Sequence, residues 1–186
     1  MPTALLLIDV ISPFDFDGAE DLLRHACAAT PAIADLARRA RRAGAPVIYA
    51  NDNYAGWTES FEQLIRRCTA PEAAGCDVAC ALRPEPDDYF VLKPKHSAFF
   101  QSPLESLLDM LGTRRLVLAG FATDICVLAT ALDAHMRELD LVVPRDAAAA
   151  ETAEAHDAAL LHFRRVLHAE TPAASAVEFE GTLAET

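Results

Sequence analysis

The sequence predicts a three-layer α/β/α domain with a mostly parallel, six-stranded, Rossmann-like sheet. Short, continuous apolar segments alternate along the chain with longer Ala- and Leu-rich segments of helical period. The chain has 186 residues and a hydrophobic fraction of 52%, which suits one domain with a sizeable core. We therefore interpret residues 1–186 as a single domain.

The first half of the chain supplies three of the predicted strands. TALLLIDV (3–10) is a continuous apolar run that ends at an acid, which is typical of a buried parallel strand. Residues 19–43 have a helical pattern, with Thr30-Pro31 as an internal N-cap and first-turn proline. Gly44 ends this helix. The other elements of this half are a strand at 46–51, a helix at 58–68 and, after a proline-rich loop, a strand at 88–93.

The second half continues the same alternation. Ser102-Pro103 begins a helix that extends to about residue 111, and Glu105 is placed to complete a capping box. The AAAA segment at 147–150 is interpreted only as the approach to a helix. The remaining elements are strands at 114–120 and 138–144, helices at 124–138 and 151–168, a short strand near 169–171 and a last helix begun by Thr171-Pro172.

Charge and cysteine content limit the possible partners and location. The formal net charge of −12 disfavours nucleic acid, because phosphate binding requires a basic surface. No apolar segment is long enough to cross a membrane, and no secretory signal precedes ALLLI. We therefore expect a cytoplasmic protein with reduced thiols. Cys68, Cys76 and Cys80 lack a second ligand pair at zinc spacing, so we predict that they are buried as small apolar residues.

A set of reactive side chains follows the predicted strands. Parallel sheets bind ligands beyond the carboxyl ends of their strands, and Asp9, Asn51-Asp52, Lys93, Gly120–Cys126 and Asp146 lie there. Cys126 begins a helix, whose N-terminus stabilises a thiolate, and a neighbouring lysine lowers the thiol pKa further. A carboxylate accepts the thiol proton, and backbone amides of the same turn stabilise an oxyanion. Asp9, Lys93 and Cys126 therefore form a candidate nucleophilic site.

Three segments also resemble the isochorismatase-like cysteine hydrolases, a superfamily that includes nicotinamidases, carbamoylsarcosine amidohydrolases and ureidoacrylate-type amidohydrolases. The segments are LLLIDV, VLKPKHSAFF and GFATDICVLATALDA, in matching order and spacing over nearly the whole chain. The resemblance implies that Asp9, Lys93 and Cys126 are the catalytic triad. It also implies a cis peptide just before Ala122, with the amides of Ala122 and Cys126 as the oxyanion hole.

Departures from the family pattern bear on metal and substrate. Nicotinamidases carry an Asp-x-His metal-ligand pair after the second strand, where this chain has Asn51-Asp52-Asn53 and no imidazole. We therefore predict no metal and no other cofactor. Ile11 replaces a glutamine that is common in the first segment. True isochorismatases generally lack the cysteine, so Cys126 favours an amidase.

The sequence thus predicts a hydrolase of C–N bonds other than peptide bonds, acting on a small, neutral or cationic molecule through a thioester. We expect a homo-oligomer, a dimer or tetramer, as is common in the family. Three alternatives remain open: a redox protein that uses Cys126, an isochorismatase-type hydrolase and a non-catalytic binder of small molecules. The histidines are interpreted as structural or exposed. Five aromatic residues are expected to line either the pocket or the core, namely Phe14, Phe16, Trp57, Phe99 and Phe121. The residues expected to contact substrate are Phe14, Asn51, Trp57 and Phe121.

Overall fold

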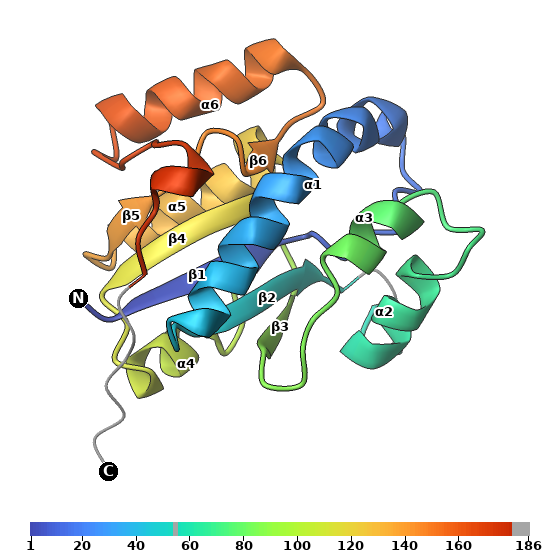
Figure 1. Cartoon of the computed structure of the whole chain (residues 1–186), viewed down its shortest axis with the longest axis horizontal. Helices are drawn as coiled ribbons and strands as arrows, with labels where there is room; N and C mark the ends of the chain where they lie inside the picture. Colours follow the sequence, from blue (N-terminus) through green and yellow to red (C-terminus); the bar gives the residue numbers. More distant parts are fainter. Residues whose placement is uncertain (54–55, 180–186) are drawn as a thin grey trace.

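The computed structural model describes residues 1–53 and 56–179 and contains a six-stranded sheet (Figure 1). Its main path runs in the order β3-β2-β1-β4-β5. The short strand β6 pairs with the last two residues of β4, Gly120 and Phe121. Every strand pairing in the described part of the chain is parallel, which confirms the predicted fold class. The strands are β1 (Thr3–Ile8), β2 (Val47–Asp52), β3 (Tyr89–Lys93), β4 (Arg115–Phe121), β5 (Asp140–Val142) and β6 (Ala148–Ala149).

Helices cover both faces of the sheet. Figure 1 shows α1 crossing in front of the central strands, whereas α4 and α5 lie behind them. A π-helical turn, η1, connects β4 to α5, and a short 3-10 helix, η2, follows near the C-terminus. The helical segments are α1 (Ala19–Arg42), α2 (Phe61–Cys68), α3 (Cys76–Ala81), α4 (Leu104–Met110), η1 (Thr123–Val127), α5 (Leu128–His135), α6 (Ala153–Arg165) and η2 (Ala174–Ala176).

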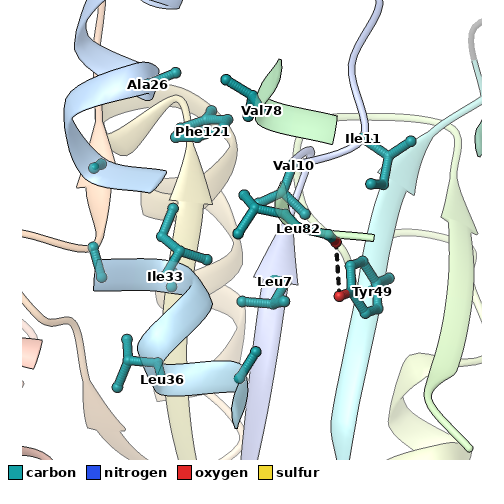
Figure 2. Packing of buried hydrophobic residues seen from close by; sticks show 14 of the residues in the cluster. Leu7, Val10, Ile11, Ala26, Ile33, Leu36, Tyr49, Val78, Leu82 and Phe121 are labelled. Carbon is teal, nitrogen blue, oxygen red and sulfur yellow. Dashed lines mark hydrogen bonds between the residues drawn. The ribbon is translucent and has the colours of Figure 1, made fainter. Parts of the chain in front are cut away.

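The central strand β1 divides the core into two layers. Leu5 and Leu7 point to the layer formed with α1, while Leu6 and Ile8 point to the layer formed with α4, α5 and α6. All four side chains are fully buried, as is expected of a parallel strand covered on both faces. Figure 2 shows the first layer, in which the hydroxyl of Tyr49 donates a hydrogen bond to the carbonyl of Leu82 at 2.9 Å.

Helix α1 differs from the sequence-based expectation at its middle. The helix continues through Pro31, so the predicted internal N-cap at Thr30 is wrong. The hydroxyl of Thr30 instead donates to the carbonyl of Ala26 at 2.8 Å. Pro31 cannot donate to the carbonyl of Cys27, but both residues lie on the exposed face, where water can bond to that oxygen. The end of the helix before Gly44 agrees with the prediction.

The sixth strand is not where the sequence placed it. Within the AAAA segment, Ala148 and Ala149 form β6 beside Gly120 and Phe121, because small side chains let this segment approach the end of β4. Near 169–171 the structure has only a single bridge, between Val142 and Glu170.

Smaller differences concern helix ends and cysteines. Helix α3 replaces part of the predicted proline-rich loop, and η2 replaces the predicted last helix. Glu105 forms no capping box, because its carboxylate pairs with Arg137 at 3.0 Å. Cys68 is buried as predicted, but Cys76 is half-buried and Cys80 is exposed, so that prediction was wrong for both. No helix in the described ranges is long and apolar enough to cross a bilayer.

The sheet register brings the carboxyl ends of four strands together. Ile8 is paired with both Ala50 and Gly120, and Asp52 is paired with Lys93. Gly120 makes the closest approach, since a Cβ built on it would lie 2.1 Å from the carbonyl oxygen of Ile8. Its φ of 118° also disfavours any other residue. This contact holds the beginning of the η1 turn against the end of β1.

Replacing Gly120 by alanine therefore combines a backbone clash with an unfavourable φ. We expect Gly120→Ala to lower the free energy of unfolding by about 3 kcal/mol or more. Gly112 is the matched control, because its φ is 63° and a Cβ added to it would meet no atom within 4 Å. Gly112→Ala should cost only about 1–2 kcal/mol. Urea unfolding measures both values, and equal losses would contradict the close approach at Gly120.

Candidate active site

A buried lysine lies at the centre of the site. Lys93 is the last residue of β3, and its side chain is completely buried. Its Nζ lies 2.9 Å from Oδ2 of Asp9 and 2.5 Å from Oδ1 of Asp52. The two carboxylates follow or end the neighbouring strands β1 and β2. A buried ammonium requires such partners, because burial without them would favour its neutral form.

Backbone contacts fix the position of Asp9. It follows β1 directly with a φ of 53°, and its N–H donates to the carbonyl of Ala50 at 2.9 Å. Its Oδ1 accepts a hydrogen bond from the N–H of Asp52 at 2.8 Å. One carboxylate oxygen is therefore held by the backbone of β2, and the other faces Lys93.

Cys126 reaches the same cluster from the η1 turn after β4. Its Sγ lies 3.6 Å from Nζ of Lys93, and the residue is 7% exposed. The peptide bond between Phe121 and Ala122 is cis, at the position implied by the family resemblance. The N–H groups of Ile125 and Val127 both donate to the carbonyl of Ala122, which defines the tight turn. The structure thus brings Asp9, Lys93 and Cys126 together.

The protonation states differ from a simple thiolate site. Burial raises the pKa of the Cys126 thiol, and the Asp9 carboxylate raises it further, although Lys93 opposes both effects. The predicted lowering of the thiol pKa is therefore wrong. Burial also raises the pKa of Asp9 to about 6, against the lowering influence of Lys93. Burial alone would lower the pKa of Lys93, but the carboxylate of Asp9 and the neighbouring Cys126 and Asp52 outweigh it and raise that pKa.

These shifts define the resting state at neutral pH. Asp9 is a carboxylate, Lys93 is an ammonium and Cys126 is a neutral thiol. Asp9 is thus an unprotonated base close to the S–H group of Cys126. The proton must leave the sulfur during the attack on a substrate rather than before it.

An apolar cavity of about 330 Å³ opens above the cluster. Asp9, Asp52 and Cys126 lie in its lining, and Phe14 and Phe121 form part of its wall, as expected for substrate contacts. The volume is at the lower end of the range for small-molecule sites. The cavity therefore accommodates a small organic molecule over the thiol.

Two expected substrate contacts lie outside this cavity. Asn51 is fully buried, and its Nδ2 donates to the carbonyl of Ile11 at 2.8 Å. Trp57 is 63% exposed, and its backbone N–H donates to Oδ1 of Asn53 at 2.8 Å. Both therefore take part in local structure, and neither lines the cavity that contains Cys126. Phe16 lines the cavity, whereas Phe99 belongs to the core.

Sequence reasoning missed the roles of Asp52 and His96. Asp52 was recognised at a strand end, but its pairing with Lys93 depends on the β2–β3 register, which the sequence does not reveal. His96 is exposed and lines the cavity, with Nδ1 3.7 Å from Sγ of Cys126. The available signal was its position three residues after Lys93, in the loop that follows a strand.

The donor set does not suit a metal ion. Asp9, Asp52 and Cys126 place one donor atom each within 4.8 Å of one another. The ammonium of Lys93 lies among them, at 2.9, 2.5 and 3.6 Å. A metal cation would compete with this ammonium for the same donors. Lys93 therefore supplies the positive charge that these ligands neutralise.

The chain is similar to known proteins in both sequence and fold. Residues 3–174 match the family model of the isochorismatase domain. The uncharacterized isochorismatase family protein YaaI of Bacillus subtilis is 38% identical over 167 residues, covering 90% of this chain and 91% of that protein. A probable inactive nicotinamidase of Arabidopsis thaliana is 29% identical over 174 residues, covering 88% and 89%. The crystal structure of N-carbamoylsarcosine amidase from Thermoplasma acidophilum has a TM-score of 0.72 and 26% identity, covering 96% and 99%.

The raised pKa of Asp9 predicts a measurable titration. Below a pH of about 6 the carboxyl group is protonated and cannot accept the thiol proton, and above it the carboxylate is available. We expect the 13C carboxyl resonance of Asp9 to titrate near pH 6 and to disappear in Asp9→Asn. The rate of any reaction that uses this base should fall as the pH falls through the same range. A titration of Asp9 near 4 would contradict this assignment.

Proposed function

The chain belongs to the isochorismatase family, and from that premise we propose that it is a cysteine hydrolase that cleaves a C–N amide or carbamoyl-type bond of a small molecule. Cys126 is the nucleophile and Asp9 the proton acceptor, while Lys93 holds the charges in place. Hydrolysis proceeds through a thioester. Because the Arabidopsis relative is described as a probable inactive nicotinamidase, the proposal depends on this chain's own side chains rather than on membership of the family.

The single observation that carries the proposal is the position of one thiol beside one base and one ammonium. Sγ of Cys126 lies 3.6 Å from Nζ of Lys93, which is itself 2.9 Å from Asp9. All three groups are buried, and Asp9 and Cys126 line an apolar cavity. A nucleophile, a base and a fixed charge within reach of one ligand site are the parts that acyl transfer requires.

In the first step the sulfur of Cys126 attacks the substrate carbonyl carbon. The S–H proton passes to the carboxylate of Asp9, and the carbonyl π electrons move to oxygen. Burial makes a free thiolate costly, so proton transfer accompanies formation of the C–S bond. We assign the backbone amides of Ala122 and Cys126 to the resulting oxyanion, because Ala122 caps the turn after β4 in which Cys126 lies.

Collapse of the tetrahedral intermediate breaks the C–N bond. The carboxyl group of Asp9 gives its proton to the leaving nitrogen, which departs as ammonia or an amine. The acyl group remains on Cys126 as a thioester, and Asp9 is again a carboxylate. A neutral leaving amine matters, because an amide anion is too basic to be expelled near neutral pH.

Water completes the cycle. Asp9 removes a proton from water as the oxygen attacks the thioester carbonyl, and the second tetrahedral intermediate collapses by releasing sulfur. The proton on Asp9 returns to Cys126, and the product leaves as a carboxylic or carbamic acid. Lys93 keeps its proton throughout and remains between the carboxylates of Asp9 and Asp52.

Loss of the nucleophile gives the first functional test, on a panel of small carboxamides and carbamoyl compounds. Cys126→Ala should reduce kcat by about a thousandfold or more, and Asp9→Asn by about a hundredfold or more, with the fold retained. Cys27→Ala is the matched control, because Cys27 is an exposed thiol on α1. Steady-state kinetics and circular dichroism measure the two properties. Undiminished turnover in Cys126→Ala would overturn the mechanism.

The position of the ammonium leads to a second functional prediction. Since Lys93 already compensates the carboxylates of Asp9 and Asp52, we expect full activity after exhaustive chelation. Soft divalent ions that bind thiolate should inhibit by occupying Cys126. The measurement compares kcat/KM before and after dialysis against EDTA. Activity that disappears with EDTA and returns with zinc would contradict the proposed mechanism, because the reaction would then require a metal ion.

A further inference from the structure

The cavity contains a carboxylate that the proposed mechanism does not use. Glu151 lines the cavity wall and is exposed. Within residues 1–53 and 56–179, no lysine, arginine or histidine nitrogen lies within 4.0 Å of its carboxylate. By contrast, Asp9 and Asp52 are both compensated by Lys93. Glu151 is therefore the carboxylate of this cavity that has no positive partner among the described residues.

Glu151 lies beside the N-terminal ends of two helices. It precedes Thr152, the N-cap of α6, whose side chain accepts a hydrogen bond from the N–H of Ala155. Its carboxylate also lies over Gly18, the N-cap of α1, since a Cβ built on Gly18 would lie 3.4 Å from the carboxyl carbon and from both oxygens. The positive end of a helix stabilises a negative charge there. Such a contact alone would explain an acidic residue, but it does not explain why that residue lines a substrate cavity.

The remaining wall is apolar and largely aromatic. Phe14 stacks on Phe16 with ring centroids 6.4 Å apart and lies 6.2 Å from Phe121. All three rings line the cavity, whereas no lysine or arginine does; His96 is its basic residue. Aromatic faces attract organic cations, and methylated ammonium groups can contact both rings and a carboxylate. The wall thus repels anionic substrates and favours a cation with an apolar surface.

We propose that the cavity selects a cationic substrate, an alkylammonium compound that carries a carboxamide or carbamoyl group, and that Glu151 is the residue that binds its ammonium. The inference rests on the proposed function for the orientation of the ligand, with the carbonyl at Cys126 and the cation at Glu151. Phe14, Phe16 and Phe121 cover the alkyl groups between these ends. Glu151 is thus a specificity-determining residue with no part in bond breaking.

Isosteric amides test the charge separately from the shape. Betaine amide is a cation, and 3,3-dimethylbutanamide is its neutral isostere, in which a carbon replaces the quaternary nitrogen. A pair with a longer chain consists of the cation 4-(trimethylammonio)butanamide and its neutral isostere 5,5-dimethylhexanamide. For at least one pair we expect the native protein to favour the cation in kcat/KM by about tenfold or more. Glu151→Gln should reduce this ratio to near one. Glu154→Gln, on the exposed face of α6, is the matched control and should keep the ratio.

Binding distinguishes failure of the inference from failure of the proposed function. If no amide is hydrolysed, the proposed function is wrong, and calorimetry with Cys126→Ala still compares each cation with its neutral isostere. Tighter binding of a cation that is lost in the double variant Cys126→Ala/Glu151→Gln supports the inference. It is overturned if both members of each pair behave alike, if no cation binds, or if the preference survives Glu151→Gln.

Discussion

The site depends on one interaction, the pairing of the buried Lys93 ammonium with two carboxylates. An ammonium removed from water is stable only when opposite charges and hydrogen bonds replace its hydration. Asp9, directly after β1, and Asp52, at the end of β2, provide them, with carboxylate oxygens 2.9 and 2.5 Å from Nζ of Lys93. In the sheet, β2 lies between β1 and β3. The parallel register of β1, β2 and β3 thus determines whether the charge is compensated. Fold and site are coupled through this single side chain.

The same pairing explains why the buried side chain of Cys126 stays a neutral thiol in the resting site. Two carboxylates and one ammonium leave a net negative charge beside Cys126, which disfavours a second anion on sulfur. Asp9 keeps its affinity for a proton because it is buried, and Lys93 prevents that affinity from rising further. Asp9 is therefore unprotonated at neutral pH, and its raised pKa makes it a better proton acceptor than an exposed aspartate.

Much of the site could be predicted because its residues lie at strand ends, and strand ends are visible in sequence. Asp9, Lys93 and Cys126 each follow or close an apolar run, and parallel strands bring such positions to one edge of the sheet. The pKa of Cys126 could not be predicted, because it depends on burial and on the distance to Asp9. Asn51 shows a related limit: alternation along β2 directs its side chain inward, to the carbonyl of Ile11, although it stands next to Asp52.

Some elements of the fold depend on contacts that no local pattern reveals. The segment containing Ala148 and Ala149 has the composition of a helix, but its backbone pairs with β4 and forms β6. Pro31 indicates a helix start, but packing of the buried face of α1 continues the helix through it. Tertiary packing overrides local propensity in both places. The two central layers, by contrast, follow directly from the alternating side chains of β1.

The central claim is that Cys126 carries the acyl group during hydrolysis. The most direct measurement is rapid acid quenching during turnover of an amide, followed by intact-mass spectrometry and peptide mapping. The account predicts a mass increase equal to the acyl group on the peptide that contains Cys126, formed and lost at rates consistent with turnover. Turnover without such an adduct, or with an adduct on another residue, would contradict it. A reversible disulfide at Cys126, with no amide hydrolysed, would instead indicate a redox protein.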